Sequence, residues 1–493
     1  MTRATLVATL AEAPDADGRL IERLAREADW LEVRADLVGD LDPGSLRARF
    51  PGRLLYTLRS RAEGGAFSGR AEVRRHRIVG AAPGYDLVDL EADRDLAPDL
   101  LDAIPPERRL VSWHGPATDL EGLRARFAHL SRARAALYKL VPRAENPGEE
   151  LSPLALLAEL GRDDVVAFGG GEVGFWSRLV APRLGAPLVF AAATDQEGAP
   201  GQWPLERLRR DFGLPELPPV ERLCGVVGRG ARGSLSPRLH NAAYRHLGLP
   251  FLYVPFEVEH FGDFWLEVVE SEALDRLGLP LAGLSVTTPH KDVAFAVAGA
   301  TSPLATMLQA VNTLTPRQGV WEGESTDAED VVAALAARGV GAAGRRAAVI
   351  GCGGAGRAAA VGLARAGARV AFVHRGSERG LAAARALGLP FVLLAELDPG
   401  AFDLFVHATP LGRDAADALP LPVGRLAAGS VVVDLVYGEG PTRLVEEAAR
   451  RGLIAVDGRE VLLRQAAPQF RAMTGRELPL GVAAHALGLE GER

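Results

Sequence analysis

Residues 347–357 read AAVIGCGGAGR, and this stretch decides the fold of the second half of the chain. Its apolar start is typical of a buried strand, and its glycines stand at the spacing GxGxxG. An alanine-rich helix is expected as far as Ala366, where Gly367 ends it, and residues 369–374 read as a second strand. Bare backbone at the start of a helix suits a pyrophosphate, because the helix dipole attracts anions. The stretch predicts a dinucleotide-binding βαβ unit rather than a glycine turn of another α/β protein.

The end of this second strand indicates which dinucleotide binds. An NAD site usually has an acidic residue there for the ribose hydroxyls, whereas this chain has His374 and Arg375, with Arg379 beyond. Basic side chains at this place favour the 2′-phosphate of NADP. The cofactor residues predicted from this unit are Gly351, Gly353, Gly354, Ala355, Gly356, His374, Arg375 and Arg379.

The first half of the chain shows a different alternation. Eight short runs of strand-forming residues recur at fairly even spacing, at 5–10, 31–35, 54–58, 87–91, 110–113, 136–141, 165–168 and 188–190. Helix-like stretches stand between them, among them 18–27, 119–130, 151–160 and 204–211. Eight strands alternating with helices within about 215 residues predict a (β/α)8 barrel, whose chemistry lies at the C-terminal ends of its strands.

Polar residues gather at those strand ends. On or just after the second, third, fifth and sixth runs they are Glu32, Arg34, Arg59, Glu63, His114 and Lys139, and Arg178 and Gln202 lie in the segments after the last two runs. A single arginine at such a place is usually a solvated loop residue. Several cationic groups aimed at one mouth of a barrel favour a functional site.

Only two of the 56 lysine and arginine residues are lysines, Lys139 and Lys291. Composition bias that happened to spare two positions is the simpler explanation. However, arginine cannot replace a lysine that must lose its proton, because a guanidinium stays charged and forms no Schiff base. We therefore hypothesise that both lysines are catalytic.

Lys139 and His114 suit one type of chemistry. A lysine in a confined cationic pocket has a lowered pKa, and its neutral amine can attack a ketone. The resulting iminium acidifies the neighbouring carbon, whose proton His114 can take near neutral pH. Glu63 is a candidate for orienting the imidazole, and the arginines are candidates for clamping a carboxylate with forked hydrogen bonds.

The motifs LEVRAD, TLRSRAEGG, VSWHG, LYKLV, FWSR and GAPGQ occur in that order across residues 1–218 and resemble those of type I 3-dehydroquinate dehydratases. The resemblance implies that Lys139 forms a Schiff base with 3-dehydroquinate and that His114 abstracts the adjacent proton, with loss of water to 3-dehydroshikimate. It implies that Arg178 and Gln202 hold the carboxylate and ring hydroxyls, with Glu32, Arg34 and Arg59 lining the rest. Residues 169–171 and Gly198 depart from the family's methionine and serine, which predicts looser loop closure over the substrate.

A second set of motifs precedes the nucleotide unit. These are SLSP at 234–237, LSVTTPHK at 284–291, AVNT at 310–313 and STD at 325–327. Each alone is more often a cap or a turn. Together, their hydroxyls, amide and lysine–aspartate pair suit a carboxylated polyol, and as an ordered set they resemble shikimate dehydrogenases from about residue 222 to the end.

This second resemblance implies an NADP-dependent reaction with Lys291 and Asp327 as the catalytic pair. It implies that the substrate is bound by Ser234, Ser236, Thr287, Asn312, Tyr437 and Gln465, and it adds Leu435 and Gly458 to the cofactor site. Ser285, Ser325, His374 and His407 stand where the family has asparagine. The shorter serines predict weaker or water-bridged contacts at positions 285 and 325.

The chain has 493 residues, which is too long for one ordinary domain. We predict an α/β protein with a type I dehydratase barrel at 1–218, a substrate-binding subdomain at 219–327 completed by residues 465–493, and a Rossmann subdomain at 328–464. The proline-rich stretch at 212–219 is expected to be a stiff connection between the two enzyme modules.

The composition of the chain disfavours several classes of binding partner. The net charge of −7 argues against nucleic acid or an anionic membrane as the main partner, so small-molecule substrates are expected. Cys224 and Cys352 are too few for a disulfide framework or a metal cage, and no metal site is predicted. The start of the chain reads as a strand rather than a signal peptide, and no apolar stretch reaches the ~20 residues of a membrane span, which predicts a cytoplasmic protein.

The two halves together predict consecutive reactions. 3-Dehydroquinate would lose water at Lys139, and NADPH would reduce the product to shikimate at Lys291. One alternative is catabolic use of the same domains on quinate in the oxidative direction. Another is a metabolite-sensing regulator that kept the folds and lost the chemistry. The presence of His114, Lys139, Lys291 and Asp327 favours an enzyme over a regulator.

Overall fold

The computed structural model describes residues 2–15, 17–413 and 416–489, apart from the side chains of Thr2, Ser377 and Arg379. Contacts divide the chain into two units. The first consists of Met1–Leu223 and Gly248–Leu281, and the second of Cys224–Leu247 and Ala282–Arg493. The domain boundaries at 218, 327 and 464 stay predictions. Among the described residues, no helix combines the length and the apolar character needed to cross a membrane.

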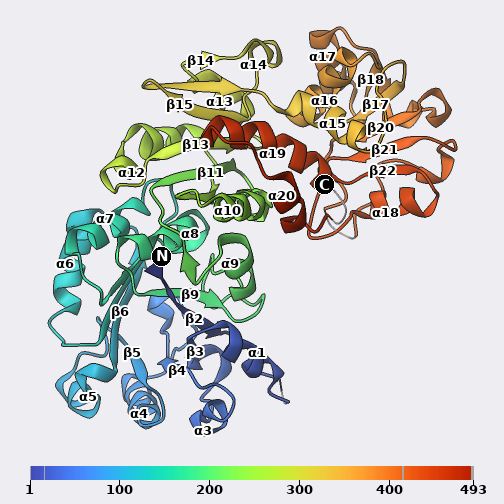
Figure 1. The fold of residues 1–493 in the computed structure, drawn as a ribbon. Coiled ribbons are helices and arrows are strands. Elements are labelled where there is room, and N and C mark those ends of the chain that lie inside the picture. Colours follow the sequence, from blue (N-terminus) through green and yellow to red (C-terminus); the bar gives the residue numbers. More distant parts are fainter. Residues whose placement is uncertain (1, 16, 414–415, 490–493) are drawn as a thin grey trace. The chain divides into compact units, whose positions relative to one another are not determined.

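Eight parallel strands form the barrel of the first unit (Figure 1). They are β2 (Thr5–Leu10), β3 (Trp30–Arg34), β4 (Arg53–Thr57), β5 (Leu87–Glu91), β6 (Arg109–Pro116), β7 (Leu137–Arg143), β8 (Val165–Ala167) and β9 (Leu188–Ala192). Their order is β8-β7-β6-β5-β4-β3-β2-β9, so strands adjacent in sequence from β2 to β8 are adjacent in the sheet. The predicted (β/α)8 arrangement is confirmed.

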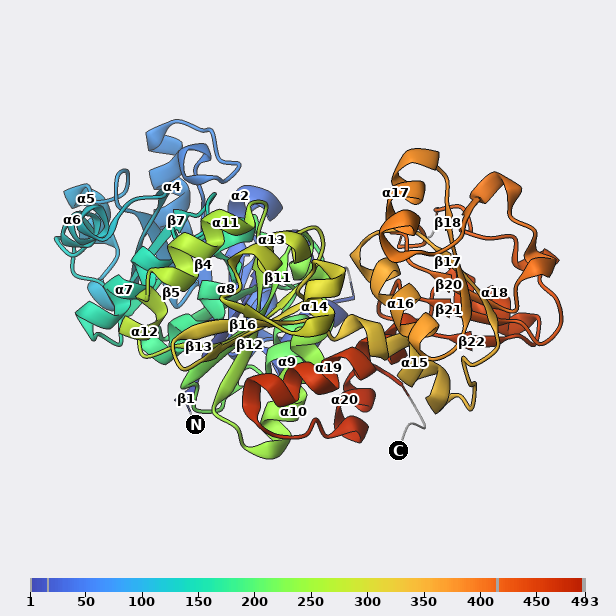
Figure 2. The same ribbon diagram turned by 90° about the horizontal axis from the view of Figure 1, so that it is seen from above.

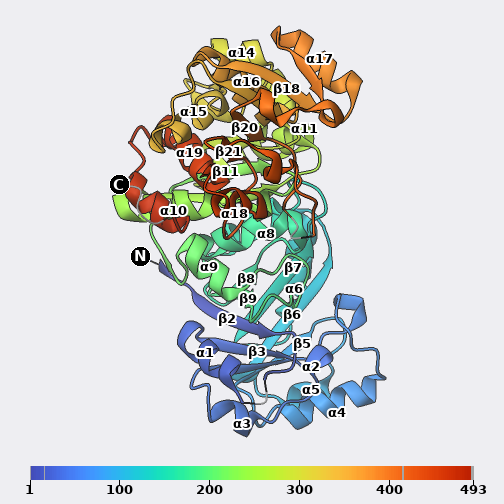
Figure 3. The same cartoon turned by 90° about the vertical axis from the view of Figure 1, so that its right-hand side faces the viewer.

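Helices cover the outside of this barrel (Figure 3). They are α1 (Arg19–Glu27), α2 (Ala35–Val38), α3 (Pro43–Arg47), α4 (Ala71–Ala81), α5 (Pro98–Ala103), α6 (Leu120–Leu130), α7 (Leu151–Leu160), α8 (Gly171–Val180) and α9 (Leu205–Phe212). The cap of α6 shows why a helix starts there, since the Asp119 side chain accepts a hydrogen bond from the Gly122 amide at 2.8 Å. A short antiparallel pair, β1 (Thr2–Arg3) with β10 (Glu216–Leu217), joins the two ends of the barrel segment.

Two acidic side chains lie on the same side of β5, near one end of the strand. All five residues of this strand, LVDLE, are buried. Successive side chains of a strand point to opposite faces, so Leu87, Asp89 and Glu91 share one side, while Val88 and Leu90 share the other. Two carboxylates therefore lie on the same side of β5, toward its C-terminal end, where the chemistry of such barrels lies.

The loop after β8 packs closely against the start of α8. A Cβ atom on Gly174 would lie 2.6 Å from the backbone carbonyl carbon of Gly169, and a Cβ on Gly169 would lie 2.7 Å from the Cβ of Glu150. Only glycines allow this close approach of the two backbones. The approach positions α8, which carries Arg178 one turn further along.

The segment Gly248–Leu281 shares an aromatic core with the barrel helix α8. It contains β12 (Phe251–Glu257), α11 (Phe261–Phe264), the π-helix η5 (Trp265–Glu270) and α12 (Ala273–Arg276). The Trp176 ring of α8 meets the Phe256 ring edge-on at 5.1 Å, and Phe256 lies 5.0 Å from Phe264. Large aromatic rings bury much apolar area, which explains why this segment belongs to the first unit.

The second unit contains two sheets. In the first sheet, β11 (Arg222–Gly228), β13 (Leu281–Val286), β15 (Thr313–Arg317), β16 (Val320–Glu324) and β14 (Ala300–Thr301) lie in that order. β15 is antiparallel to both β13 and β16, whereas β14 is parallel to β16. The helices of this region are α10 (Ser236–Leu247), α13 (Lys291–Val297) and α14 (Pro303–Leu308).

The second sheet of this unit is parallel and has helices on both faces (Figure 2). Its order is β19 (Phe391–Leu393), β18 (Arg369–His374), β17 (Arg346–Ile350), β20 (Leu404–His407), β21 (Val431–Asp434) and β22 (Ile454–Val456). One face packs on α15 (Asp327–Ala337), α16 (Gly354–Arg365) and α17 (Ser377–Leu387), and the other on α18 (Arg443–Arg450). The predicted βαβ unit is confirmed as β17-α16-β18. Two further helices, α19 (Gly458–Thr474) and α20 (Leu480–Ala486), end the described chain.

Candidate active sites

Lys139 lies on β7 with its side chain almost fully buried, at 5% exposure. Its Nζ lies 3.7 Å from the centre of the Phe190 ring. Burial lowers the pKa of Lys139 to about 8; Glu32 and Asp89 oppose this shift, and Arg59 strengthens it. An amine with such a pKa is partly neutral near pH 7, so it can act as a nucleophile.

His114 and Glu63 form a pair beside it. His114 lies near the end of β6, and Glu63 lies on the 3-10 turn η1 (Arg61–Glu63) after β4. Glu63 Oε2 accepts a hydrogen bond from the His114 amide at 3.0 Å and lies 3.2 Å from Nδ1. Burial lowers the pKa of His114 well below its usual value, and the charges of Arg59 and Lys139 lower it further. Burial raises the pKa of Glu63 to about 8. His114 is therefore a neutral proton acceptor, with Glu63 at Nδ1 and Nε2 left for a substrate.

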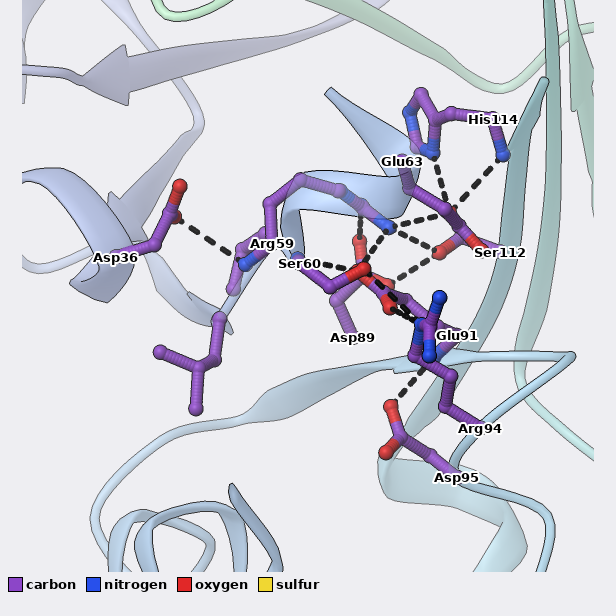
Figure 4. A network of polar contacts seen from close by, with 12 residues as sticks. Asp36, Arg59, Ser60, Glu63, Asp89, Glu91, Arg94, Asp95, Ser112 and His114 are labelled. Carbon is purple, nitrogen blue, oxygen red and sulfur yellow. Dashed lines mark hydrogen bonds and ion pairs between the residues drawn. The ribbon is translucent and has the colours of Figure 1, made fainter. Parts of the chain in front are cut away.

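A network of polar contacts centred on Arg59 surrounds this pair (Figure 4). The Arg59 guanidinium donates hydrogen bonds to Glu63 at 3.0 Å, to Asp89 at 2.5 Å and to Ser112 at 2.9 Å, and Glu91 lies 3.4 Å from it. Sequence analysis selected Arg59 but missed Asp89, Glu91 and Ser112. The alternating acids at the end of β5 were the signal that could have revealed two of them. The network holds Arg59 and Glu63 in a fixed geometry.

Glu32 and Gln202 share one partner on the neighbouring strand. Glu32 accepts hydrogen bonds from Thr9 Oγ1 at 2.6 Å and from Thr57 Oγ1 at 2.8 Å. Gln202 donates to Thr9 Oγ1 at 2.9 Å and accepts from the Gly198 amide at 3.1 Å. A Cβ on Gly198 would lie 2.7 Å from the Thr9 side chain, so a serine there would displace it. The departure at Gly198 therefore suits this arrangement.

Two further arginines complete the barrel site. Arg34, at the end of β3, forms a forked pair with Asp36 at 2.9 and 2.8 Å. Arg178, on α8, is buried; it donates to the Phe190 carbonyl at 3.2 Å, and its guanidinium lies 4.6 Å from the Phe168 ring. Hydrogen bonds, ring contacts and charge interactions thus connect all the residues that sequence analysis selected in the barrel.

A second site forms around one carboxylate of the second unit. Lys291 Nζ, at the start of α13, donates to Asp327 Oδ2, at the start of α15. Asp327 Oδ1 accepts from Asn312 Nδ2 and from Gln465 Nε2 of α19. Asn312 Oδ1 in turn accepts from the Thr326 amide at 2.9 Å. The structure brings together these four predicted residues, which lie up to 174 positions apart in sequence, from Lys291 to Gln465.

The other predicted substrate residues of this unit lie at three places. Ser234 and Ser236 lie at the start of α10, where Ser234 Oγ accepts from the Ser236 amide at 3.1 Å. Thr287 follows β13 and Tyr437 follows β21, and both side chains are half-buried. In the part of the chain that is described, no hydrogen bond joins these four residues to Asp327.

The departure at Ser285 keeps a buried polar contact. Its hydroxyl donates to Gln469 Oε1 of α19 at 2.9 Å. Gln469 also donates to the Asn312 carbonyl at 3.4 Å. A serine at this position therefore still links β13 to α19, and through Gln469 to the substrate motif. The predicted weakening of contacts at 285 and 325 stays a prediction.

The glycine-rich loop has the form that a pyrophosphate requires. Gly351 has φ +112°, and a Cβ on Gly356 would lie 2.1 Å from the Gly351 carbonyl oxygen. At Gly353, the N-cap of α16, nothing lies within 4 Å of where a Cβ would be. A Cβ on Gly354 would lie 3.4 Å from the Cδ of Lys291. The loop therefore presents bare backbone at a helix N-terminus next to Lys291, which fits a dinucleotide.

Other predicted cofactor residues lie at the end of β18, after β21 and at the start of α19. His374 ends β18, and its Nδ1 accepts a hydrogen bond from the Gly376 amide at 3.0 Å. Arg375 follows it and is exposed, while the side chain of Arg379 lies outside the described part of the structure. Leu435 follows β21, and Gly458 begins α19, where a Cβ would lie 2.4 Å from a backbone carbonyl oxygen.

His407 and Asp434 form a buried pair whose role sequence analysis missed. His407 ends β20 and Asp434 ends β21, and His407 Nδ1 lies 2.9 Å from Asp434 Oδ1. The other imidazole nitrogen contacts Thr409 Oγ1, and Asp434 accepts from Thr442 Oγ1 at 2.6 Å. The pair ties two strand ends to the N-cap of α18. The signal available was that both residues end apolar strands of a sheet whose ligands bind at that edge.

Comparisons with known proteins agree with this arrangement. The family model for type I 3-dehydroquinase matches residues 6–214, and that for the shikimate dehydrogenase substrate binding domain matches residues 226–314. A shikimate dehydrogenase (NADP(+)) of Rubrobacter xylanophilus is 37% identical over 289 residues, which cover 56% of this chain and 99% of that protein. The chain belongs to the shikimate dehydrogenase family. A type I 3-dehydroquinase domain precedes its dehydrogenase part.

One relative matches both parts. The chloroplastic bifunctional 3-dehydroquinate dehydratase/shikimate dehydrogenase of Arabidopsis thaliana is 28% identical over 487 residues, which cover 92% of this chain and 78% of that protein. A crystal structure of a shikimate dehydrogenase in complex with NADP+ is 26% identical, with a TM-score of 0.50, and covers 55% of this chain and 96% of that chain.

A family model for an FAD binding domain matches residues 346–412. These residues contain the β17-α16-β18 unit. FAD and NAD(P) proteins share this glycine-rich pyrophosphate cradle, so the match concerns the unit rather than the cofactor. The Rubrobacter relative, by contrast, matches over nearly its whole length and is an NADP enzyme by name.

Proposed function

We propose that this chain is a bifunctional enzyme of the shikimate pathway, which dehydrates 3-dehydroquinate and then reduces the product to shikimate with NADPH. The observation that carries this proposal is the assembly of one reactive lysine with its partners in each unit. Lys139 lies in the barrel with His114 and Glu63, and Lys291 lies with Asp327 beside the glycine-rich loop. A regulator that had lost its chemistry would have no need to keep both sets.

In the first reaction, the neutral amine of Lys139 attacks the ring ketone, and loss of one water gives an iminium. His114 takes a proton from the adjacent carbon, and the hydroxyl group one carbon further leaves as a second water with a proton returned by His114. Hydrolysis of the iminium consumes one water, so that one water is lost overall. Arg178 and Gln202 hold the carboxylate and hydroxyls of the substrate, while Glu32, Arg34 and Arg59 line the rest of the pocket.

In the second reaction, Lys291 and Asp327 handle the proton at the oxygen being reduced. The Lys291 ammonium donates its proton to the ketone oxygen, and Asp327, which Asn312 and Gln465 hold in place, keeps the ammonium oriented. NADPH, when bound over the glycine-rich loop, supplies the hydride. Ser234 and Ser236 bind the substrate carboxylate, and Thr287 and Tyr437 contact its hydroxyls.

The cofactor proposal extends to the 2′-phosphate of NADP, which Arg375 is placed to bind beside the end of β18. The partners that we propose are small molecules, namely 3-dehydroquinate, 3-dehydroshikimate and shikimate, rather than nucleic acid or membrane. We propose a cytoplasmic location. The net charge of −7 supports the proposal on partners, because it disfavours binding to nucleic acid and to anionic membranes.

Two full-length variants test the two functions separately. Lys139→Arg should abolish dehydration and leave shikimate oxidation intact, whereas Lys291→Ala should do the reverse. Borohydride treatment with 3-dehydroquinate, followed by peptide mass mapping, should place an adduct on Lys139. Absence of that adduct, together with unchanged dehydratase activity in Lys139→Arg, would contradict the Schiff-base mechanism. Turnover of shikimate and quinate with NADP and NAD determines the preferred substrate pair.

A further inference from the structure

An ion pair connects two separate substrate motifs of the second unit. Arg238 lies in the first turn of α10, two residues after Ser236, and is 5% exposed. Its Nη1 donates to Glu439 Oε2 at 2.8 Å and its Nη2 to Glu439 Oε1 at 2.6 Å. Glu439 lies two residues after Tyr437, and its side chain is 62% exposed. The pair spans 201 positions of sequence and joins the start of α10 to the loop after β21.

The loop at residues 435–441 has a firmly held base and a glycine-flanked tip. At the base, Asp434 accepts hydrogen bonds from the Val436 amide at 3.0 Å and from Thr442 Oγ1 at 2.6 Å. At the tip, nothing lies within 4 Å of where a Cβ would be on Gly438 or Gly440. Glycines also leave the backbone free to take other conformations. The contact of Glu439 with Arg238 therefore ties this tip to α10.

The geometry of the pair determines orientation as well as distance. A forked arginine–carboxylate contact forms only when the two planar groups are aligned, which a lysine would not require. A buried cation in the first turn of a helix is also disfavoured by the helix dipole and by desolvation, and the Glu439 carboxylate offsets both. The ion pair with Glu439 is therefore electrostatically favourable for the buried Arg238. It also fixes the loop that contains Tyr437.

We propose that Arg238 is a positioning residue of the dehydrogenase, which acts through Glu439 to hold Tyr437 beside the start of α10. This inference rests on the proposed dehydrogenase function. When the pair is broken, the substrate itself must order the loop, so the cost appears in the KM for shikimate rather than in kcat. Neither residue needs to touch the reacting atoms.

The test uses the full-length variants Arg238→Met, Arg238→Lys, Glu439→Gln and the double variant Arg238→Met/Glu439→Gln. Steady-state oxidation of shikimate with NADP gives KM and kcat, and an unchanged kcat reports that the second unit of the variant is folded. We expect Arg238→Met to raise the KM for shikimate about tenfold and to change kcat by less than about twofold. Arg238→Lys should be intermediate, and the double variant should be no worse than Arg238→Met, because the two residues act as one unit.

Arg338 provides the matched control. It forms the same kind of forked pair, with Glu460 at 2.6 and 2.7 Å, between the C-cap of α15 and the first turn of α19. Arg338→Met should leave the KM for shikimate unchanged. Raising the salt concentration should shrink the difference between wild type and Arg238→Met, because Glu439 is exposed and its charge is screened.

Three results would overturn the inference while wild type turns over shikimate: an unchanged KM in Arg238→Met, an equal rise in Arg338→Met, or single-variant effects that add up in the double variant. Absence of shikimate turnover in wild type would instead overturn the proposed function, and this inference with it.

Discussion

The reactivity of Lys139 should depend on pH in a way that follows from its burial and from the charges around it. Burial brings its pKa to about 8 from the usual 10.5. About one amine in ten is then neutral near pH 7, against about one in three thousand for an ordinary lysine, and the same difference corresponds to about 3 kcal/mol against the charged form. The perturbation of choice is Glu32→Gln, because Glu32 is the largest of the influences that raise this pKa. Losing a nearby opposite charge should lower the pKa of Lys139 by about one unit.

Limited labelling with cyanate across a series of pH values, read by peptide mass, measures this directly. The chain helps the assay, since Lys291 is its only other lysine and gives an internal reference. We expect the labelling of Lys139 to rise with an inflection near pH 8 in wild type, and about one unit lower in Glu32→Gln. Glutamine can keep one of the two threonine hydrogen bonds that Glu32 accepts, which limits other changes. A wild-type inflection close to that of an ordinary lysine, or a rise of the inflection in Glu32→Gln, would refute the reasoning.

Other predictions concern single side chains. Glu63→Gln replaces one oxygen of the carboxyl that faces His114 Nδ1 and Arg59 by an amide nitrogen, so kcat for dehydration should fall about tenfold to a hundredfold while borohydride still traps the Lys139 adduct; an unchanged kcat would contradict the orienting role. Glu150 is buried and accepts from Trp176 Nε1 at 2.9 Å, and burial raises its pKa from 4.5 to about 7. The fold therefore favours the neutral carboxyl, and stability present below pH 4.5 is lost as the pH rises through about 7, by up to about 3 kcal/mol. Glu150→Gln should accordingly raise the free energy of unfolding near pH 8 much more than near pH 5 in urea titrations, and equal changes at both pH values would count against it. Arg375→Ala should raise the KM for NADP about tenfold and leave that for NAD unchanged; a parallel rise in both would remove Arg375 from the phosphate site.

Most of the fold could be predicted from local sequence patterns. The strands of the barrel were predictable because each is a short apolar run between helix-like stretches, and β5 was predicted with its observed ends, Leu87–Glu91. The helix that follows the glycine-rich loop was predictable from its alanines and from the glycine after it. A sequence pattern does not show, however, that Phe256 packs on Trp176 of the barrel helix α8. That contact forms only when two segments far apart in sequence pack together, and neither segment has a sequence motif that would indicate the packing.

The two lysines show what the sequence by itself determined about this protein and what only the tertiary structure decided. Their rarity among arginines and their neighbouring motifs selected Lys139 and Lys291, because the chemistry of a deprotonating amine depends on residue type and can be recognised without coordinates. The pKa of Lys139, the acids around Arg59 and the contact of Arg238 with Glu439 were decided by the fold. Burial and charge distance arise only when residues far apart in sequence are brought together, and these two quantities determine how strongly each group holds its proton.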